Sequence, residues 1–181
     1  MHKKSFLAVV SGLILAMATY NALAFTCTDG NANPIIGQTI VGGVNVPDNA
    51  ECTLINVTVN GNVIVGVNAA LLVCSSTING SVQGANSNDI HLGEVDGYNC
   101  PGNTINGPVT IRGTLGVELD DNVINGTVTL TNNGQATVNP SVEVENNFIT
   151  GSLRCSGNNN ITTNTFSNTV IGRKTGQCAD F

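Results

Sequence analysis

A short motif that recurs six times is the feature that most restricts the possible folds of this chain. Each copy has three residues: an apolar residue, a second residue that is usually Asn or Thr, and Gly. The copies are Val59-Asn60-Gly61, Ile78-Asn79-Gly80, Ile105-Asn106-Gly107, Ile124-Asn125-Gly126, Ile149-Thr150-Gly151 and the degenerate Val170-Ile171-Gly172. Their glycines are 19, 27, 19, 25 and 21 residues apart. Self-similarity at such a period indicates stacked repeats.

The residues after each glycine predict a strand with one buried face. A polar and then an apolar residue follow the first five glycines, and a second apolar residue often comes two positions later. Repeats of about 22 residues hold two or three short strands but no helical crossover. We therefore expect an all-β, right-handed parallel β-helix of about six to seven coils, with strands about 4.8 Å apart. A β-sandwich is the alternative, because short strands with frequent turns also have this pattern.

Asparagine distinguishes the two folds, because parallel stacking brings identical side chains into register. The position four residues before the glycine is held by Ser76, Asn103, Asn122, Asn147 and Asn168. Amides stacked in this way can bond one another along the rod. We predict a structural asparagine ladder there, and a bend at each glycine that needs positive φ or close backbone approach.

These V-x-G-x-V units, with the closing segment Gly151–Asn158 and Gly176-Gln177-Cys178, resemble small secreted bacterial repeat proteins. The resemblance covers about residues 52–178 and implies the pectate-lyase-like form of the right-handed parallel β-helix. It implies no particular activity. Enzymes of this architecture commonly cleave acidic polysaccharides with carboxylates that hold Ca²⁺ and a nearby Arg or Lys.

Residues 1–24 have the features of a secretory signal peptide: Lys3 and Lys4, an apolar centre, and small residues before the expected cleavage site after Ala24. An uncleaved anchor is the alternative, but polar residues interrupt the apolar run. We expect a capping region at 25–51 and a β-helix with a C-terminal cap at 52–181. The mature chain would be secreted or periplasmic, without membrane insertion.

Six cysteines in an exported chain indicate disulfides. Sequence separations of one coil favour Cys27–Cys52, Cys74–Cys100 and Cys155–Cys178, because cysteines in similar phase on neighbouring coils lie within disulfide range. A zinc site is disfavoured, because the chain has no CxxC pair and His91 is its only histidine after the signal peptide. With Asp89 and Glu94, His91 is predicted to lie in a loop.

An acidic repeat is the main candidate for a site. Segments 116–126 and 141–151 align without gaps, which would place Val117 and Leu119 inside. The outward carboxylates would be Glu118, Asp120, Glu143 and Glu145. We favour a solvated acidic stripe, while a Ca²⁺ site with Asp121 beside it is the alternative, because stacked like charges are unfavourable.

Catalysis would need a base or substrate-binding cation, and Arg112 and Arg154 are the candidates. Aromatic residues that stack on sugars are scarce, and Phe148 and Phe166 are expected in the core or turns. Twelve acidic side chains against four basic ones after the signal peptide disfavour nucleic-acid binding. An ice-binding threonine ladder is also disfavoured, since only Thr127-Val128-Thr129 has the outward T-x-T pair after the glycine.

We therefore expect an exported, non-catalytic β-solenoid that serves as a structural or surface-interaction module and requires no cofactor. Its partner would be an extracellular polysaccharide or a surface protein. The alternative is a calcium-dependent enzyme or binder acting on acidic polysaccharide.

Overall fold

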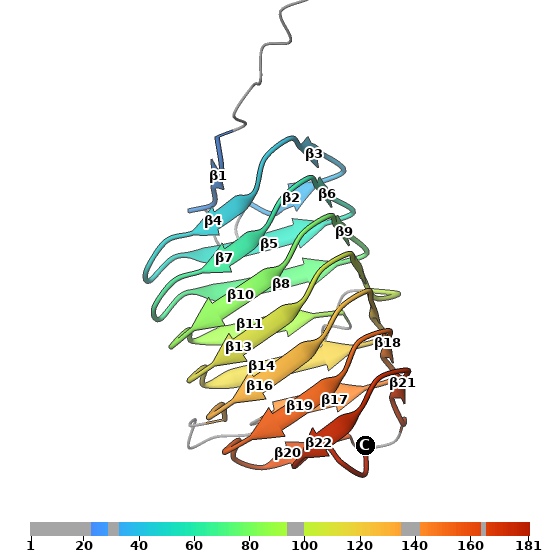
Figure 1. Cartoon of the computed structure of the whole chain (residues 1–181). Coiled ribbons are helices and arrows are strands. Elements are labelled where there is room, and N and C mark those ends of the chain that lie inside the picture. The colour runs from blue at the N-terminus through green and yellow to red at the C-terminus, as the bar shows by residue number, and fades with distance from the viewer. Residues whose placement is uncertain (1–22, 29–32, 94–99, 135–141, 164–165) are drawn as a thin grey trace, which may run out of the picture.

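The structure is a computed structural model that describes residues 23–28, 33–93, 100–134, 142–163 and 166–181. Its strands form three sheets, and each strand pairs in parallel with the strand three places further along the chain. The coils therefore stack as a rod, with the N-terminal strands at one end and the C-terminal strands at the other (Figure 1). The predicted parallel β-helix is confirmed.

We name the sheets A, B and C. Sheet A has eight strands. They are β1 (Phe25–Thr26), β4 (Val44–Val46), β7 (Val63–Val65), β10 (Val82–Ala85), β13 (Val109–Arg112), β16 (Val128–Thr131), β19 (Leu153–Ser156) and β22 (Lys174–Gly176). Sheet B has seven strands. They are β2 (Ile35–Ile36), β5 (Glu51–Ile55), β8 (Ala70–Cys74), β11 (Asp89–Leu92), β14 (Gly116–Asp120), β17 (Val142–Glu145) and β20 (Ile161–Thr162).

Sheet C also has seven strands, each of two residues. They are β3 (Thr39–Ile40), β6 (Thr58–Val59), β9 (Thr77–Ile78), β12 (Thr104–Ile105), β15 (Val123–Ile124), β18 (Phe148–Ile149) and β21 (Thr169–Val170). The first strand of this sheet, at Thr39–Ile40, thus lies one coil before the first copy of the repeated motif.

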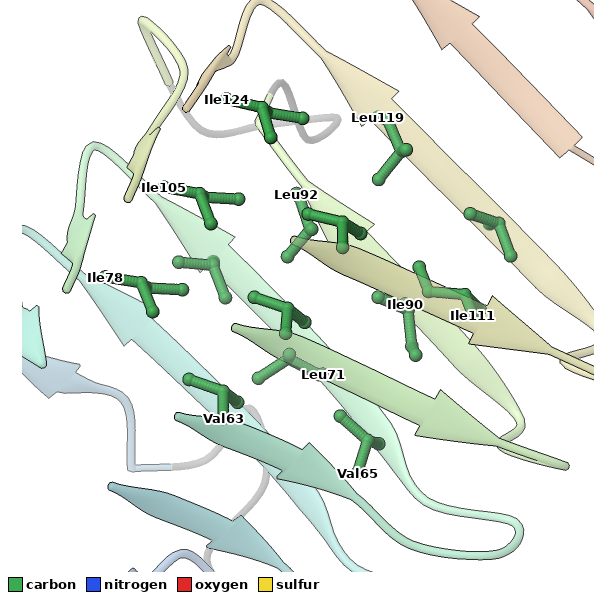
Figure 2. Close-up of a cluster of buried hydrophobic side chains, with 14 of the residues drawn as sticks. Val63, Val65, Leu71, Ile78, Ile90, Leu92, Ile105, Ile111, Leu119 and Ile124 are labelled. Carbon is green, nitrogen blue, oxygen red and sulfur yellow. The ribbon is translucent and has the colours of Figure 1, made fainter. Parts of the chain in front are cut away.

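The core runs along the axis of the rod, between the three sheets. Alternate residues of each strand point inward, so that Ile78, Ile105 and Ile124 lie above one another in register (Figure 2). All three are fully buried. Full burial of such a side chain contributes about 1.5–3 kcal/mol, and repetition in every coil makes this the main stabilising term.

The repeated glycines lie at the corner between sheets C and A. A Cβ atom added to Gly126 would lie 2.5 Å from the carbonyl oxygen of Gly107, and one added to Gly151 would lie 2.4 Å from that of Gly126. None of these three glycines has positive φ. Close backbone approach, one of the two predicted reasons, therefore explains the repeated Gly.

The predicted asparagine ladder is confirmed at the corner between sheets B and C. The side-chain oxygen of Asn147 accepts hydrogen bonds from the backbone N–H and the amide of Asn122, both at 3.0 Å. Asn122 accepts equivalent bonds from Asn103, and the side-chain oxygen of Asn168 accepts them from Asn147 in the same way. A second buried ladder, formed by Asn133 and Asn158, lies at the corner between sheets A and B.

The three disulfides have the expected pairings. Cys27–Cys52 and Cys155–Cys178 lie toward the two ends of the rod, with Cα–Cα distances of 5.6 and 5.4 Å. Cys74–Cys100 joins neighbouring coils at 5.2 Å. Two bonds thus hold the coils nearest the open ends, where strand edges lack partners.

The predicted signal peptide lies outside the described residues except for Leu23 and Ala24, and β1 begins at the next residue. Residues 25–51, predicted as a cap, contribute the first strand of every sheet. Within the described ranges, no helix is long and apolar enough to cross a membrane.

Candidate functional site

The acidic repeat lies on sheet B, where β14 and β17 pair in the predicted register. Glu118 is opposite Glu143, and Asp120 is opposite Glu145. The glutamates are partly exposed on the outer face, while Val117 and Leu119 are buried, as expected. The four carboxylates are therefore brought together on two adjacent coils.

The prediction that Asp120 is solvated is wrong. Its relative exposure is only 7%, and within the described residues its Oδ1 atom is buried without a hydrogen-bond partner. Asp120 is the last residue of β14, where the chain leaves the strand for the corner, so the strict alternation of the strand no longer sets its exposure. Burial, and then the charges of Glu143, Glu118 and Glu145, raise the pKa of Asp120 to about 8.

The prediction that His91 lies in a loop is also wrong. It occupies β11 of sheet B, in register between Leu72 and Glu118. Its Nε2 atom lies 2.9 Å from Asp89 Oδ2, and its Nδ1 atom lies 3.1 Å from Glu118 Oε2. Two carboxylates thus face the two ring nitrogens, an arrangement that suits an imidazolium with both N–H groups donating.

Electrostatics agrees with this geometry. Burial lowers the pKa of His91, but the hydrogen bond to Asp89 and the charges of Asp89, Glu118 and Asp120 together raise it above its ordinary value. The charge of the stacked acids is thus partly offset within the protein itself: the raised pKa of His91 favours its positive charge at one end, and the raised pKa of Asp120 disfavours its negative charge in the middle.

The residues that the structure describes contain no group of three or more His, Cys, Asp or Glu side chains placed to hold a metal ion. Glu118, Asp120, Glu143 and Glu145 therefore remain a predicted calcium site only. A depression of about 300 Å³ lies beside them on sheet B. Its lining includes Glu51, Ala70, Leu72, Asn88, Asp89 and His91.

The candidate catalytic arginines lie on another sheet. Arg112 is on β13 and Arg154 is on β19, both exposed on the outer face of sheet A. Sheet A lies in front of sheet B in Figure 1, and both sheets turn their inner faces toward the shared core. The outer faces therefore point apart, and the arginines and the sheet B carboxylates do not form one site.

Sheet C carries a regular surface that the sequence analysis missed. Thr39, Thr58, Thr77 and Thr104 are consecutive neighbours in one in-register row. A second row is formed by Asn60, Asn79, Asn106 and Asn125. The first three lie two residues after Thr58, Thr77 and Thr104, while Val41 follows Thr39 and Asn125 follows Val123 at the same distance. We call these two rows the threonine–asparagine face.

Hydrogen bonds run along the asparagine row. The Asn79 amide donates to Asn60 Oδ1 at 2.9 Å, and the Asn106 amide donates to Asn79 Oδ1 at the same distance. Asn125 extends the row by a 2.8 Å bond to Asn106. These asparagines are exposed, whereas the residues between the two rows, such as Ile78 and Ile105, are fully buried.

An apolar pair interrupts the threonine row before Thr169. Val123 follows Thr104 and pairs with Phe148, and these side chains are 40% and 42% exposed. The expectation of a core or turn position is therefore wrong for Phe148, which lies on the outer face of sheet C. Phe166 is 57% exposed and lies outside the strands.

The signal for this face was present in the sequence as Thr58-Val59-Asn60-Gly61, Thr77-Ile78-Asn79-Gly80 and Thr104-Ile105-Asn106-Gly107. The T-x-T position after the glycine, predicted for a threonine ladder, lies on sheet A. The observed threonine row lies before the glycine, on sheet C.

Comparison of the chain with protein-family models, with curated proteins and with solved structures gives no significant match.

Proposed function

We propose that the protein is an exported, non-catalytic β-helix that binds an extended surface outside the cytoplasm, in the periplasm or beyond the cell. The observation that carries the proposal is the threonine–asparagine face. From Thr39 to Ile171, the outward side chains along sheet C are Thr, Asn, Val, Phe or Ile, with no charged residue among them. A rigid, uncharged side on an acidic protein suits a neutral, repeating ligand.

The proposal also includes the compartment of the protein and its resemblance to secreted repeat proteins. Three disulfides are typical of proteins in an oxidising, extracytoplasmic compartment. The resemblance to small secreted bacterial repeat proteins supports export. The catalytic alternative, an enzyme on acidic polysaccharide, gains no support, because Arg112 and Arg154 lie on a different sheet from the carboxylates.

Co-sedimentation with cellulose, chitin and peptidoglycan sacculi, together with uptake into growing ice, tests the proposal. The wild-type protein should bind at least one of these solids. Thr77→Lys places a charged side chain in the middle of the face and should abolish that binding. Thr110→Lys makes the same change at an exposed, outward position of sheet A and should leave binding intact.

Two results would contradict the proposal. One is binding to none of the four solids, or binding that Thr77→Lys does not reduce. The other is release of unsaturated sugars from pectin or alginate that is abolished by Arg112→Ala or Arg154→Ala, which would establish a catalytic function.

A further inference from the structure

We infer that the threonine–asparagine face binds ice, so that the extended ligand of the proposed function, on which this inference rests, is crystalline water. The two rows run side by side along the rod. Neighbouring coils are about 4.8 Å apart, and in three coils an Asn follows the Thr by two residues, just beyond the two-residue strand. On the prism faces of hexagonal ice, oxygen atoms repeat as a rectangle whose shorter side is close to the spacing between coils.

The array is held rigidly before any ligand arrives. The amides of Asn79, Asn106 and Asn125 each donate to the amide of the preceding coil. The backbone N–H groups of Thr58, Thr77 and Thr104 donate to carbonyl groups of the preceding coil at 2.8–2.9 Å. Threonine is also β-branched, which restricts χ1. A face whose side chains are already fixed loses little entropy when it binds a regular surface.

The chemistry of the side chains suits water in a crystal. Threonine has a methyl group, whose removal from liquid water is favourable in free energy. Next to it is a hydroxyl group that can donate and accept hydrogen bonds within the lattice. Asparagine adds an amide with both functions. Charged side chains would hold disordered hydration shells, and none occurs among the outward residues of this sheet.

Two other occupants fit less well. Sugar rings bind on aromatic side chains, yet the only aromatic among the outward residues of sheet C is Phe148, one coil beyond Asn125. A second copy of the chain would bury mainly small polar groups, whereas stable interfaces have an apolar centre. Ice is the ligand that uses both rows.

Uptake of the purified full-length mature protein into a slowly growing ice hemisphere tests the inference. The wild-type protein should be concentrated in the ice, and Thr77→Lys should reduce uptake to the level of a protein without an ice-binding surface. Thr77→Ser, which keeps the hydroxyl and removes the methyl, should also lower uptake. Thr110→Lys should match the wild type. Melting temperatures of the variants identify any loss of uptake that comes from unfolding.

The outcomes separate this inference from the proposed function. Exclusion of the wild-type protein from ice, with Thr77-dependent binding to chitin, cellulose or sacculi, would overturn the inference and leave the proposed function standing. Exclusion from ice and from all three polymers would overturn both. A concentration-dependent dimer that Thr77→Lys dissociates would identify a second copy as the occupant and overturn the assignment to ice.

Discussion

Asn122 illustrates how one side chain can link three coils of the rod. Its amide donates to the carbonyl oxygen of Leu92 at 2.6 Å and to Asn147 Oδ1 at 3.0 Å, while its own oxygen accepts from Asn103. All of these groups are buried, so each bond that is lost leaves a polar group without water. The exposed asparagine row has the same residue type but an open path to solvent.

Asn122→Ala should therefore lower the free energy of unfolding by about 3 kcal/mol, because at least two buried polar groups lose their partner. Asn125→Ala removes an equivalent amide from the exposed row and should cost less than about 1 kcal/mol, since water can replace the lost bond. Urea denaturation of both variants measures the difference. Equal losses would show that burial of the ladder is not what stabilises this corner.

Asp120 and His91 are two further single residues that matter, because they make the stability of the folded protein depend on pH. Both have a folded-state pKa above the unfolded value, so the folded protein binds more protons than the unfolded chain. For Asp120 the contribution is complete below about pH 4 and is lost as the pH rises toward about 8. His91 acts in the same direction, since its contribution is lost as the pH rises through its raised pKa.

The melting temperature of the wild-type protein should therefore be higher at pH 5 than at pH 8. Asp120→Asn, which mimics the protonated acid, should raise the melting temperature at pH 8 and change it little at pH 5. Asp180→Asn removes an exposed carboxylate and controls for net charge. A wild-type protein that is more stable at pH 8, with no gain from Asp120→Asn, would show that Asp120 is ionised in the folded state.

At the scale of single elements, the two-residue strands of sheet C depend on the glycine that follows. The corner between sheets C and A brings the backbones of successive coils so close that no Cβ fits at Gly107, Gly126 or Gly151. The obstacle is backbone rather than the flexible end of a side chain, so neighbouring groups cannot move aside.

Gly126→Ala should destabilise the protein by about 3 kcal/mol or more, because the new Cβ would displace the chain at Gly107 from the stack. The matched change is Thr150→Ala, at the exposed position immediately before Gly151, the equivalent glycine of the next coil. It removes side-chain atoms without adding any. Thermal denaturation should show a large loss for the first variant and a small one for the second. A tolerated Gly126→Ala would mean that the coils are further apart than described.

Some elements could be predicted from the sequence and others could not. The strands of sheet A follow each glycine with clear period-two alternation, and the Val117 and Val142 segments of sheet B align without gaps. Strand β11 was missed because the 27-residue spacing between Gly80 and Gly107, the longest of the five, hid its alignment with β14, so that His91 was predicted in a loop. Sheet C was missed because two residues are too few to show a period, and its Asn positions have the composition of turns.

The candidate site could likewise be predicted from the sequence only in part. Register placed the four carboxylates correctly, because their slots repeat in sequence. The burial of Asp120 and the contact between His91 and Glu118 depend on how the corner is packed, which no spacing reveals. Arg112 and Arg154 were grouped with the acids by coil, but membership of a coil does not specify which of its three sides a residue occupies.

At the scale of the whole molecule, one geometric relation produces both the core and the candidate ligand surface. Each coil is placed directly over the last, so buried isoleucines stack inside while Thr58, Thr77 and Thr104 line up outside. Disulfides near both ends hold the coils whose strands have a neighbour on one side only. The rod therefore presents a fixed array over several coils, which neither a single hairpin nor a flexible repeat could maintain.

Nuclear Overhauser effects between threonine methyl groups test this relation most directly. Parallel, in-register coils place the methyl groups of Thr58 and Thr77 near each other, and likewise those of Thr77 and Thr104, so cross-peaks are expected for both pairs. Absence of both, with contacts instead between strands that are consecutive along the chain, would identify antiparallel pairing and contradict the stacked coil and the face built on it.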